Sequence, residues 1–302
     1  MNIIGKSRIT QGQLISKRDI CKNLEIQLYD EFQSFFSLDN LYQEIVSTED
    51  IDVKNLHVPI LRHEDINLEY ISNKTFRNYI LNSFVLAQRL AEYYKHNIKI
   101  ILHSGFSYTQ YQKFPILYDE VINFLESALT KYPNVDICIE NLIPFIIENN
   151  GIQSKNGFLY DNVELVKHFR SYFNTDRFYT VLDTCHLLVT IEIISRVFSP
   201  TYTDMMRDID IESYFIENKD VIGLLHLSDV EELGYLPKQH GIKFQGHRLH
   251  KMYQFIDLYL KYNMSCDITL EIQEEDYEKS EAFKENYTDL TSYLNSKNIA
   301  FS

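Results

Sequence analysis

The 302-residue chain lacks several features that mark special classes of protein. It has no tryptophan, although 22 tyrosines and 19 phenylalanines supply ample aromatic bulk for a core. It also lacks any apolar run approaching the ~20 residues that a membrane helix needs. No Gly/Ser-rich or Pro-rich linker divides the chain, and no low-complexity tract or internal repeat is evident. We therefore expect one soluble globular domain spanning residues 1–302 and no membrane partner.

Cysteine is scarce, and its spacing does not suggest pairing. The four residues Cys21, Cys138, Cys185 and Cys266 are widely scattered, with no CxxC pair. The N-terminal sequence MNIIGKSRIT lacks the basic region and long apolar core of a secretory signal. We therefore expect free thiols and a cytoplasmic location.

Positive charge is also in short supply. The chain has 29 Lys and Arg residues against 43 Asp and Glu residues, which gives a formal net charge of −14 and a pI near 5.2. This balance argues against broad, sequence-independent nucleic-acid binding, which usually shows as a basic stripe. A bound cluster of divalent cations would reverse the local field, so the charge disfavours a DNA partner without excluding it.

Short apolar runs alternate with longer segments of helical period along the whole chain. Runs such as IKIIL, VDICI and VIGLL are apolar throughout, which is typical of parallel strands covered on both faces. Segments such as TFRNYILNSFVLAQRLAEYYKH repeat apolar residues at three- and four-residue spacing, as amphipathic helices do. We expect strands at Asn2–Gly5, Asn23–Leu28, Asn55–Val58, Ile98–Leu102, Val135–Ile139, Arg177–Leu182, Val221–Leu225 and Asp267–Leu270.

Eight strands separated by helices predict an α/β fold, a single (β/α)₈ TIM barrel. An open doubly wound sheet is the alternative, but the chain lacks the Gly-rich first turn of a Rossmann unit. In a barrel the carboxyl ends of the strands converge on one face, where active sites of such enzymes lie.

Six consecutive predicted strands each end in a His, Asp or Glu side chain. Taken singly, a histidine at a strand end is more often a hydrogen-bonded boundary residue, and a carboxylate there more often caps a helix. Six such residues in succession indicate a shared site instead. Their types match ligands of Zn²⁺ and, for a carboxylate-rich site, Mn²⁺. They are His57, His103, Glu140, Asp183, His226 and Glu271.

The stretch VLDTCHLLVT, residues 181–190, shows the pattern most sharply, because an apolar strand ends at Asp183 and His186 follows three residues later. An unpaired buried carboxylate costs several kcal/mol, about 2–7 for a polar group and more for a charge. Asp183 is therefore either the N-cap of a helix beginning near Cys185 or part of a site. Cys185 itself is expected to be a packing residue, because a thiol suits a softer site.

The motifs DTCH, HLSD and IEN, together with the strand-end histidines, resemble the xylose isomerase-like TIM barrels, and within them the endonuclease IV family. The resemblance runs from His57 to Glu271 and implies two zinc ions. The first is held by His57, His103 and Glu140. Glu140 bridges to the second, and the remaining ligands of that ion are Asp183, His226 and Glu271.

The resemblance also implies a third zinc, held by His186 and by an Asp-x-His pair in the loop KQHGIKFQGH. His240 stands at the histidine and Gly246 at a downstream glycine, but Lys238 replaces the aspartate. A protonated ammonium cannot bind a cation and opposes one nearby. We expect a weak or absent third site, with Lys238 supplying positive charge there; His247 and His250 are better explained as a solvated helix face.

The resemblance implies a zinc-dependent phosphoester hydrolase, with cleavage of DNA at abasic sites as the family reaction. A second reading is a sugar or sugar-phosphate isomerase or epimerase of the same superfamily, with one Mn²⁺ or similar ion. In that case Glu140 and Glu271 would act on a carbon-bound proton. The pair His57 and His103 separates the two, because only the hydrolase needs it. A non-catalytic ligand-binding descendant is a third reading, and the oligomeric state is not predicted.

Overall fold

The computed structural model describes residues 1–29, 37–58, 60–61, 64–143, 145–148, 151–154, 159–197, 211–230 and 240–302. Among these residues, no helix is both long and apolar enough to cross a bilayer. The four cysteines are buried and unpaired, as the spacing predicted.

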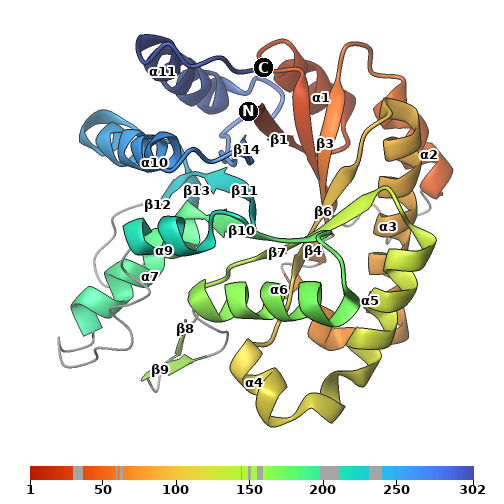
Figure 1. Ribbon diagram of the computed structural model, residues 1–302. Helices are drawn as coiled ribbons and strands as arrows, with labels where there is room; N and C mark the ends of the chain where they lie inside the picture. The colour runs from red at the N-terminus through yellow and green to blue at the C-terminus, as the bar shows by residue number, and fades with distance from the viewer. Residues whose placement is uncertain are drawn as a thin grey trace.

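Eight parallel strands close into a barrel, because β1 pairs with both β2 and β14 (Figure 1). Strands that follow one another along the chain are neighbours around the barrel, so the (β/α)₈ prediction is confirmed and the open sheet is excluded. The strands are β1 (Ile3–Ser7), β2 (Asn23–Gln27), β3 (Asp52–His57), β6 (Ile98–His103), β7 (Val135–Glu140), β10 (Phe178–Asp183), β11 (Ile222–Leu227) and β14 (Asp267–Leu270).

Helices follow the strands and cover the outside of the barrel (Figure 1). α3 shows how the sequence sets their limits: Asn73 accepts hydrogen bonds from the first-turn amides, and Lys95 ends the helix in the left-handed conformation with φ 64°. The helices are α1 (Gln11–Arg18), α2 (Leu38–Val46), α3 (Lys74–Tyr94), α4 (Tyr108–Lys113), α5 (Asp119–Lys131), α6 (Leu159–Phe173), α7 (Thr184–Val197), α9 (Ile211–Asn218), α10 (Leu249–Lys261) and α11 (Glu281–Ser296).

Within the described residues, three short antiparallel sheets extend the loops at the carboxyl ends of β3, β7 and β11. They add backbone pairing on the face where active sites of this fold lie. The pairs are β4 (Ile60–Leu61) with β5 (Glu64–Asp65), β8 (Phe145–Glu148) with β9 (Gly151–Ser154), and β12 (Asp229–Val230) with β13 (His240–Ile242).

The barrel lumen is apolar on one side and polar on the other. Side chains alternate between the lumen and the helices, because successive residues of a strand point to opposite faces. A small apolar cluster fills one side of the lumen and consists of Ile4, Ile101, Cys138, Val181 and Leu224. On the other side, Glu25, Asn55 and Thr269 are fully buried and hydrogen-bond to one another. The polar side is continuous with the strand ends described below.

Gly223 in β11 lies against Tyr179 of β10, next to a register shift between the two strands. A Cβ at Gly223 would lie 2.5 Å from Tyr179 Cβ, an atom fixed to the backbone. We predict that Gly223→Ala lowers the free energy of unfolding by about 1–3 kcal/mol, as overpacking does. The measurement is urea unfolding followed by circular dichroism.

Gly12→Ala in α1 is the matched control. The three atoms nearest to the added Cβ would all belong to the flexible Glu278 side chain, which can move away. Alanine also favours a helix over glycine by about 0.5–1 kcal/mol. Equal stability of the Gly223→Ala protein and the wild type would contradict the close packing of β10 on β11.

Candidate metal centre

The barrel brings the six predicted strand-end residues to one end of the lumen. Four of them, one each from β3, β6, β7 and β10, are the last residue of their strand. His226 is the penultimate residue of β11, and Glu271 directly follows β14. The strand register places His103 beside Glu140 and Asp183 beside His226. Parallel pairing therefore collects these side chains at the carboxyl ends of the strands.

Among the described residues, two groups of side chains could each hold a metal ion, and Glu140 belongs to both. The first consists of His57, His103 and Glu140, and the second of Glu140, Asp183, His226 and Glu271. Within each group the ligand atoms lie within 4.8 Å of one another. Nitrogen and carboxylate donors in this number suit Zn²⁺ and related divalent cations. The donor set therefore fits two neighbouring divalent ions.

Glu140 turns its two carboxylate oxygens toward different groups. Its Oε2 atom lies 3.0 Å from His57 Nε2 and 3.1 Å from His103 Nε2. Its Oε1 atom lies 3.2 Å from His226 Nδ1. Because each oxygen faces one ligand group, Glu140 has the arrangement of a bridging carboxylate.

Asp183 both caps a helix and faces the cluster. Its Oδ1 atom accepts a hydrogen bond of 2.8 Å from the backbone amide of His186 in the first turn of α7, so the capping interpretation is confirmed. Its Oδ2 atom lies 4.0 Å from His226 Nδ1. The cap uses only one oxygen, and the other remains for the second ligand group.

His186 lies beside the two groups without belonging to either. Its Nδ1 atom is 2.8 Å from the carbonyl oxygen of Asn141, 3.7 Å from Asp183 Oδ2 and 3.9 Å from Glu140 Oε1. Asn141 also accepts a 2.7 Å hydrogen bond from the Asp183 amide, so it ties the ends of β7 and β10 together. Asn141 carried no signal in the sequence beyond its place after the IEN glutamate.

The other half of the expected third site is only partly described. The backbone of His240 belongs to β13 and pairs with Val230, whereas Lys238 lies outside the described residues. His247 and His250 are exposed, as a solvated face requires. Cys185 is buried, consistent with a packing role. The weak third site therefore stays a prediction.

Two charged residues of the site were not predicted from the sequence, Lys6 in β1 and Glu25 in β2. Lys6 Nζ lies 2.7 Å from Glu271 Oε1 and 3.6 Å from Glu25 Oε1. Glu25 Oε2 lies 3.1 Å from His226 Nε2. Each does carry a weak sequence signal, because side chains two residues apart in a strand share a face. Lys6 shares a face with the apolar Ile4, and Glu25 is a charged residue between Leu24 and Ile26.

Burial and close charges perturb the protonation of the cluster. Burial alone would raise the pKa of Glu140, but the charge of His226 and hydrogen bonds from His103, His226 and His57 outweigh it and hold the pKa well below its usual range. Burial would lower the pKa of His226, but Glu25 and Glu140 raise it well above its usual range. Burial raises the pKa of Asp183 to about 6. Without a metal, the cluster therefore retains a proton on His226.

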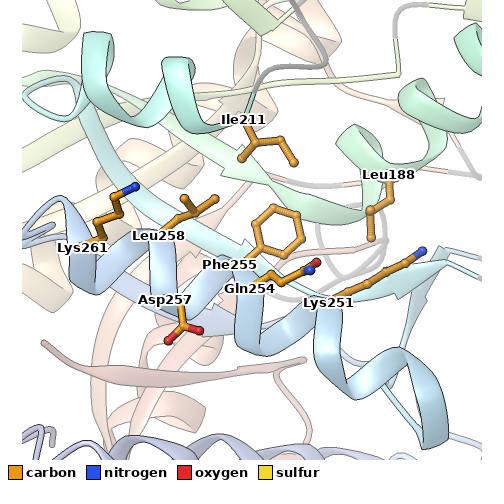
Figure 2. A pocket seen from close by; sticks show the side chains of 8 residues that line it. All are labelled: Leu188, Ile211, Lys251, Gln254, Phe255, Asp257, Leu258 and Lys261. Carbon is orange, nitrogen blue, oxygen red and sulfur yellow. The ribbon is translucent and has the colours of Figure 1, made fainter.

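A separate pocket of about 400 Å³ lies in the outer helical layer and is lined by residues of α7, α9 and α10 (Figure 2). Phe255 and Leu258 form much of its apolar wall. None of the residues that line this pocket belongs to either ligand group. The side chains that could bind metal or transfer protons therefore lie outside this pocket.

We predict that Glu140→Gln weakens metal binding at both groups, because Glu140 supplies a ligand to each. His103→Ala removes a ligand from the first group alone and should leave one ion per chain. Metal content after zinc loading and gel filtration, measured by plasma mass spectrometry, checks both variants. A Glu140→Gln protein that keeps the wild-type metal content would contradict the bridging arrangement.

Metal affinity should also fall as the pH falls. The proton that the raised pKa keeps on His226 must leave before the nitrogen binds a cation, and Asp183 is protonated below about pH 6. Zinc titrations at pH 5.5 and 7.5 should therefore show tighter binding at pH 7.5. Calorimetry in buffers of different ionisation enthalpy should show proton release, and an affinity independent of pH would refute the assignment of His226 as a ligand.

No family model and no curated protein sequence matches the chain. Solved structures do match in fold. An IOLI protein with a bound zinc atom superposes with a TM-score of 0.58 at 14% identity, covering 98% of this chain and 97% of that one. SacUVDE gives a TM-score of 0.50 at 12% identity, covering 99% and 100%.

A hyperthermophilic endocellulase from the archaeon Pyrococcus horikoshii also superposes, with a TM-score of 0.55 at 9% identity, covering 95% of this chain and 86% of that one. The three names denote different proteins, and identities this low establish a shared architecture rather than a shared reaction. The comparisons therefore show that the chain has the (β/α)₈ barrel fold along nearly its whole length.

Proposed function

We propose that this protein is a divalent-metal-dependent phosphoester hydrolase whose centre holds two metal ions at the carboxyl end of the barrel. The observation that carries the proposal is the placement of Glu140, whose two oxygens face two separate ligand groups. Paired metal sites joined by a carboxylate are typical of enzymes that cleave phosphoesters.

Each residue of the centre has a distinct task in this proposal. His57 and His103 would hold one ion through their Nε2 atoms, and His226 would hold the other through Nδ1, because these atoms face Glu140. Burial and the charge of Lys6 hold the pKa of His57 below its usual value, which keeps its nitrogen lone pair available. Bound divalent cations supply positive charge that lowers the pKa of a coordinated water and offsets the charge of phosphoryl oxygens.

Zinc is the metal we propose, with two ions. Three imidazoles accompany three carboxylates in the two groups, a nitrogen-rich set that favours zinc over Mg²⁺ or Ca²⁺. The bound zinc in the IOLI protein, which shares the fold, supports this choice. We retain the proposal that the third site is weak or absent and that Lys238 supplies positive charge at the position of the third ion.

A phosphoester is the substrate class we propose, and the resemblance to the endonuclease IV family makes DNA at abasic sites one member of that class. The net charge of −14 disfavours a long DNA contact surface. Small phosphodiesters and short oligonucleotides are therefore the substrates to test first.

A sugar isomerase or epimerase is the second candidate, and two observations favour it. The second ligand group has four members and is complete without His57 or His103. Glu271 is also the most exposed carboxylate of the centre, with 25% of its side chain accessible. One ion with Glu140 and Glu271 beside it would suit proton transfer at carbon.

The His103→Ala protein separates the two candidates. Zinc-loaded wild type and variant are assayed on a phosphodiester panel, including an oligonucleotide with an abasic site, and the manganese-loaded proteins on a panel of ketoses and aldoses. We predict that wild type hydrolyses a phosphodiester and that His103→Ala loses about 100-fold or more of that rate, at least the loss seen when a ligand's supporting partner is removed.

Asp183→Asn, which alters the second group, is the matched variant and should reduce either activity. Sugar isomerisation that survives His103→Ala but not Asp183→Asn, without phosphodiester cleavage by wild type, would replace the hydrolase with the isomerase.

A further inference from the structure

Glu25 lies in the lumen one layer beneath the ligand groups. In the register of β2 on β3, Gln27 is level with the ligand His57, and Glu25 is level with Asn55, two residues deeper. Two strand residues span about 6.6 Å. Glu25 and Asn55 are fully buried. Glu25 therefore lies too deep in the lumen to belong to either ligand group, and it lies directly beneath the ligand residues.

The carboxylate of Glu25 is turned toward one ligand, His226. Its Oε2 atom lies 3.1 Å from His226 Nε2 and accepts hydrogen bonds from Thr269 Oγ1 at 3.0 Å and Asn55 Nδ2 at 3.2 Å. Neither the Glu25 nor the His226 side chain has any exposed surface. Because three donors contact one oxygen, the carboxylate is held in a single orientation. The carboxylate can only accept, so His226 Nε2 is the protonated nitrogen that donates to it.

The opposite nitrogen of His226 is the one that faces the metal centre. Its Nδ1 atom lies 3.2 Å from Glu140 Oε1 and 3.0 Å from Glu271 Oε2. A histidine whose one nitrogen donates to a carboxylate binds metal through the other, with a fixed ring and greater basicity. The two histidines of the first group differ, because they present Nε2 to the centre.

Lys6 balances the charge of this arrangement. Its ammonium lies between Glu25 Oε1, at 3.6 Å, and Glu271 Oε1, at 2.7 Å. A buried carboxylate without a cation would cost several kcal/mol. The contact to Oε1 of Glu271 also leaves the Oε2 atom of that residue facing His226. Lys6 thus allows Glu25 to remain ionised beneath the centre and restrains a second ligand.

We propose that Glu25, supported by Lys6, is a positioning residue that sets His226 as an Nδ1 ligand and thereby raises the metal affinity of the second group. The inference rests on the metal centre of the proposed function and is independent of the reaction catalysed there. It assigns a role to the fully buried Glu25 and the largely buried Lys6, two charged residues that neither ligand group includes.

The test measures zinc affinity in the His103→Ala background, where only the second group is intact, by competition with a chromophoric chelator. Glu25→Gln retains a side chain of the same shape that can still accept from Nε2 but has no charge, and we expect about a 10-fold weaker affinity. Glu25→Met removes the acceptor as well, and we expect about a 100-fold loss. If Glu25→Met fails to fold, Glu25→Gln decides.

Glu274→Gln is the matched control. The Glu274 side chain is also buried and paired with a lysine, at 3.1 Å from Lys17 Nζ, and it accepts amide hydrogen bonds at the start of α11. Glu274 belongs to neither ligand group. Its loss should reduce stability and leave zinc affinity unchanged. Equal zinc affinity in the Glu25→Gln and parent proteins, or equal losses in Glu25→Gln and Glu274→Gln, would overturn the proposal.

A spectroscopic readout completes the test. In the zinc-loaded parent protein, nitrogen-15 NMR of the histidine rings should show His226 with a proton on Nε2 and metal on Nδ1, and Glu25→Met should lose the hydrogen-bonded Nε2 proton signal. A wild-type His226 bound through Nε2 would overturn the proposal. A protein that binds zinc in this way but cleaves no phosphoester would leave it standing and refute only the proposed reaction.

Discussion

The burial of several carboxylates at one end of the barrel is the constraint on which the rest of the site depends. Glu140 and Asp183 are almost completely buried, and Glu25 lies beneath them. Carboxylates this close repel one another in a medium that screens poorly, and each costs several kcal/mol to bury unpaired. Lys6 and the histidines offset part of this charge. Divalent cations in the two ligand groups would offset the remainder.

The barrel explains why the cluster can exist at all. Each strand is hydrogen-bonded to a neighbour on both sides and packs against apolar side chains. The residues at the carboxyl ends of the strands are therefore held by a rigid backbone. The lumen is apolar beside β6, β7 and β10 and polar beside β2, β3 and β14. On the polar side, Glu25 supports His226 through a hydrogen bond to its Nε2 atom.

The fold and the six strand-end residues of the site were predictable from the sequence, whereas Lys6 and Glu25 beneath them were not. A ligand such as His103 or Glu140 stands out because an apolar run stops at it. Glu25 lies inside a strand, and period-two alternation cannot tell a lumen position of a barrel from a solvent-facing one. Lys6 lies one residue past the predicted end of the first strand, and only barrel closure brings β1 beside β14. Non-local pairing of this kind leaves no local signal.

The most direct test of the account is an anomalous diffraction measurement on crystals of the zinc-loaded protein, with data collected on both sides of the zinc absorption edge. The account predicts two anomalous peaks on either side of the Glu140 carboxylate, one next to His57 and His103 and the other next to His226. A single peak at the second group would favour the one-metal isomerase, and no peak at Glu140 would contradict the metal centre itself.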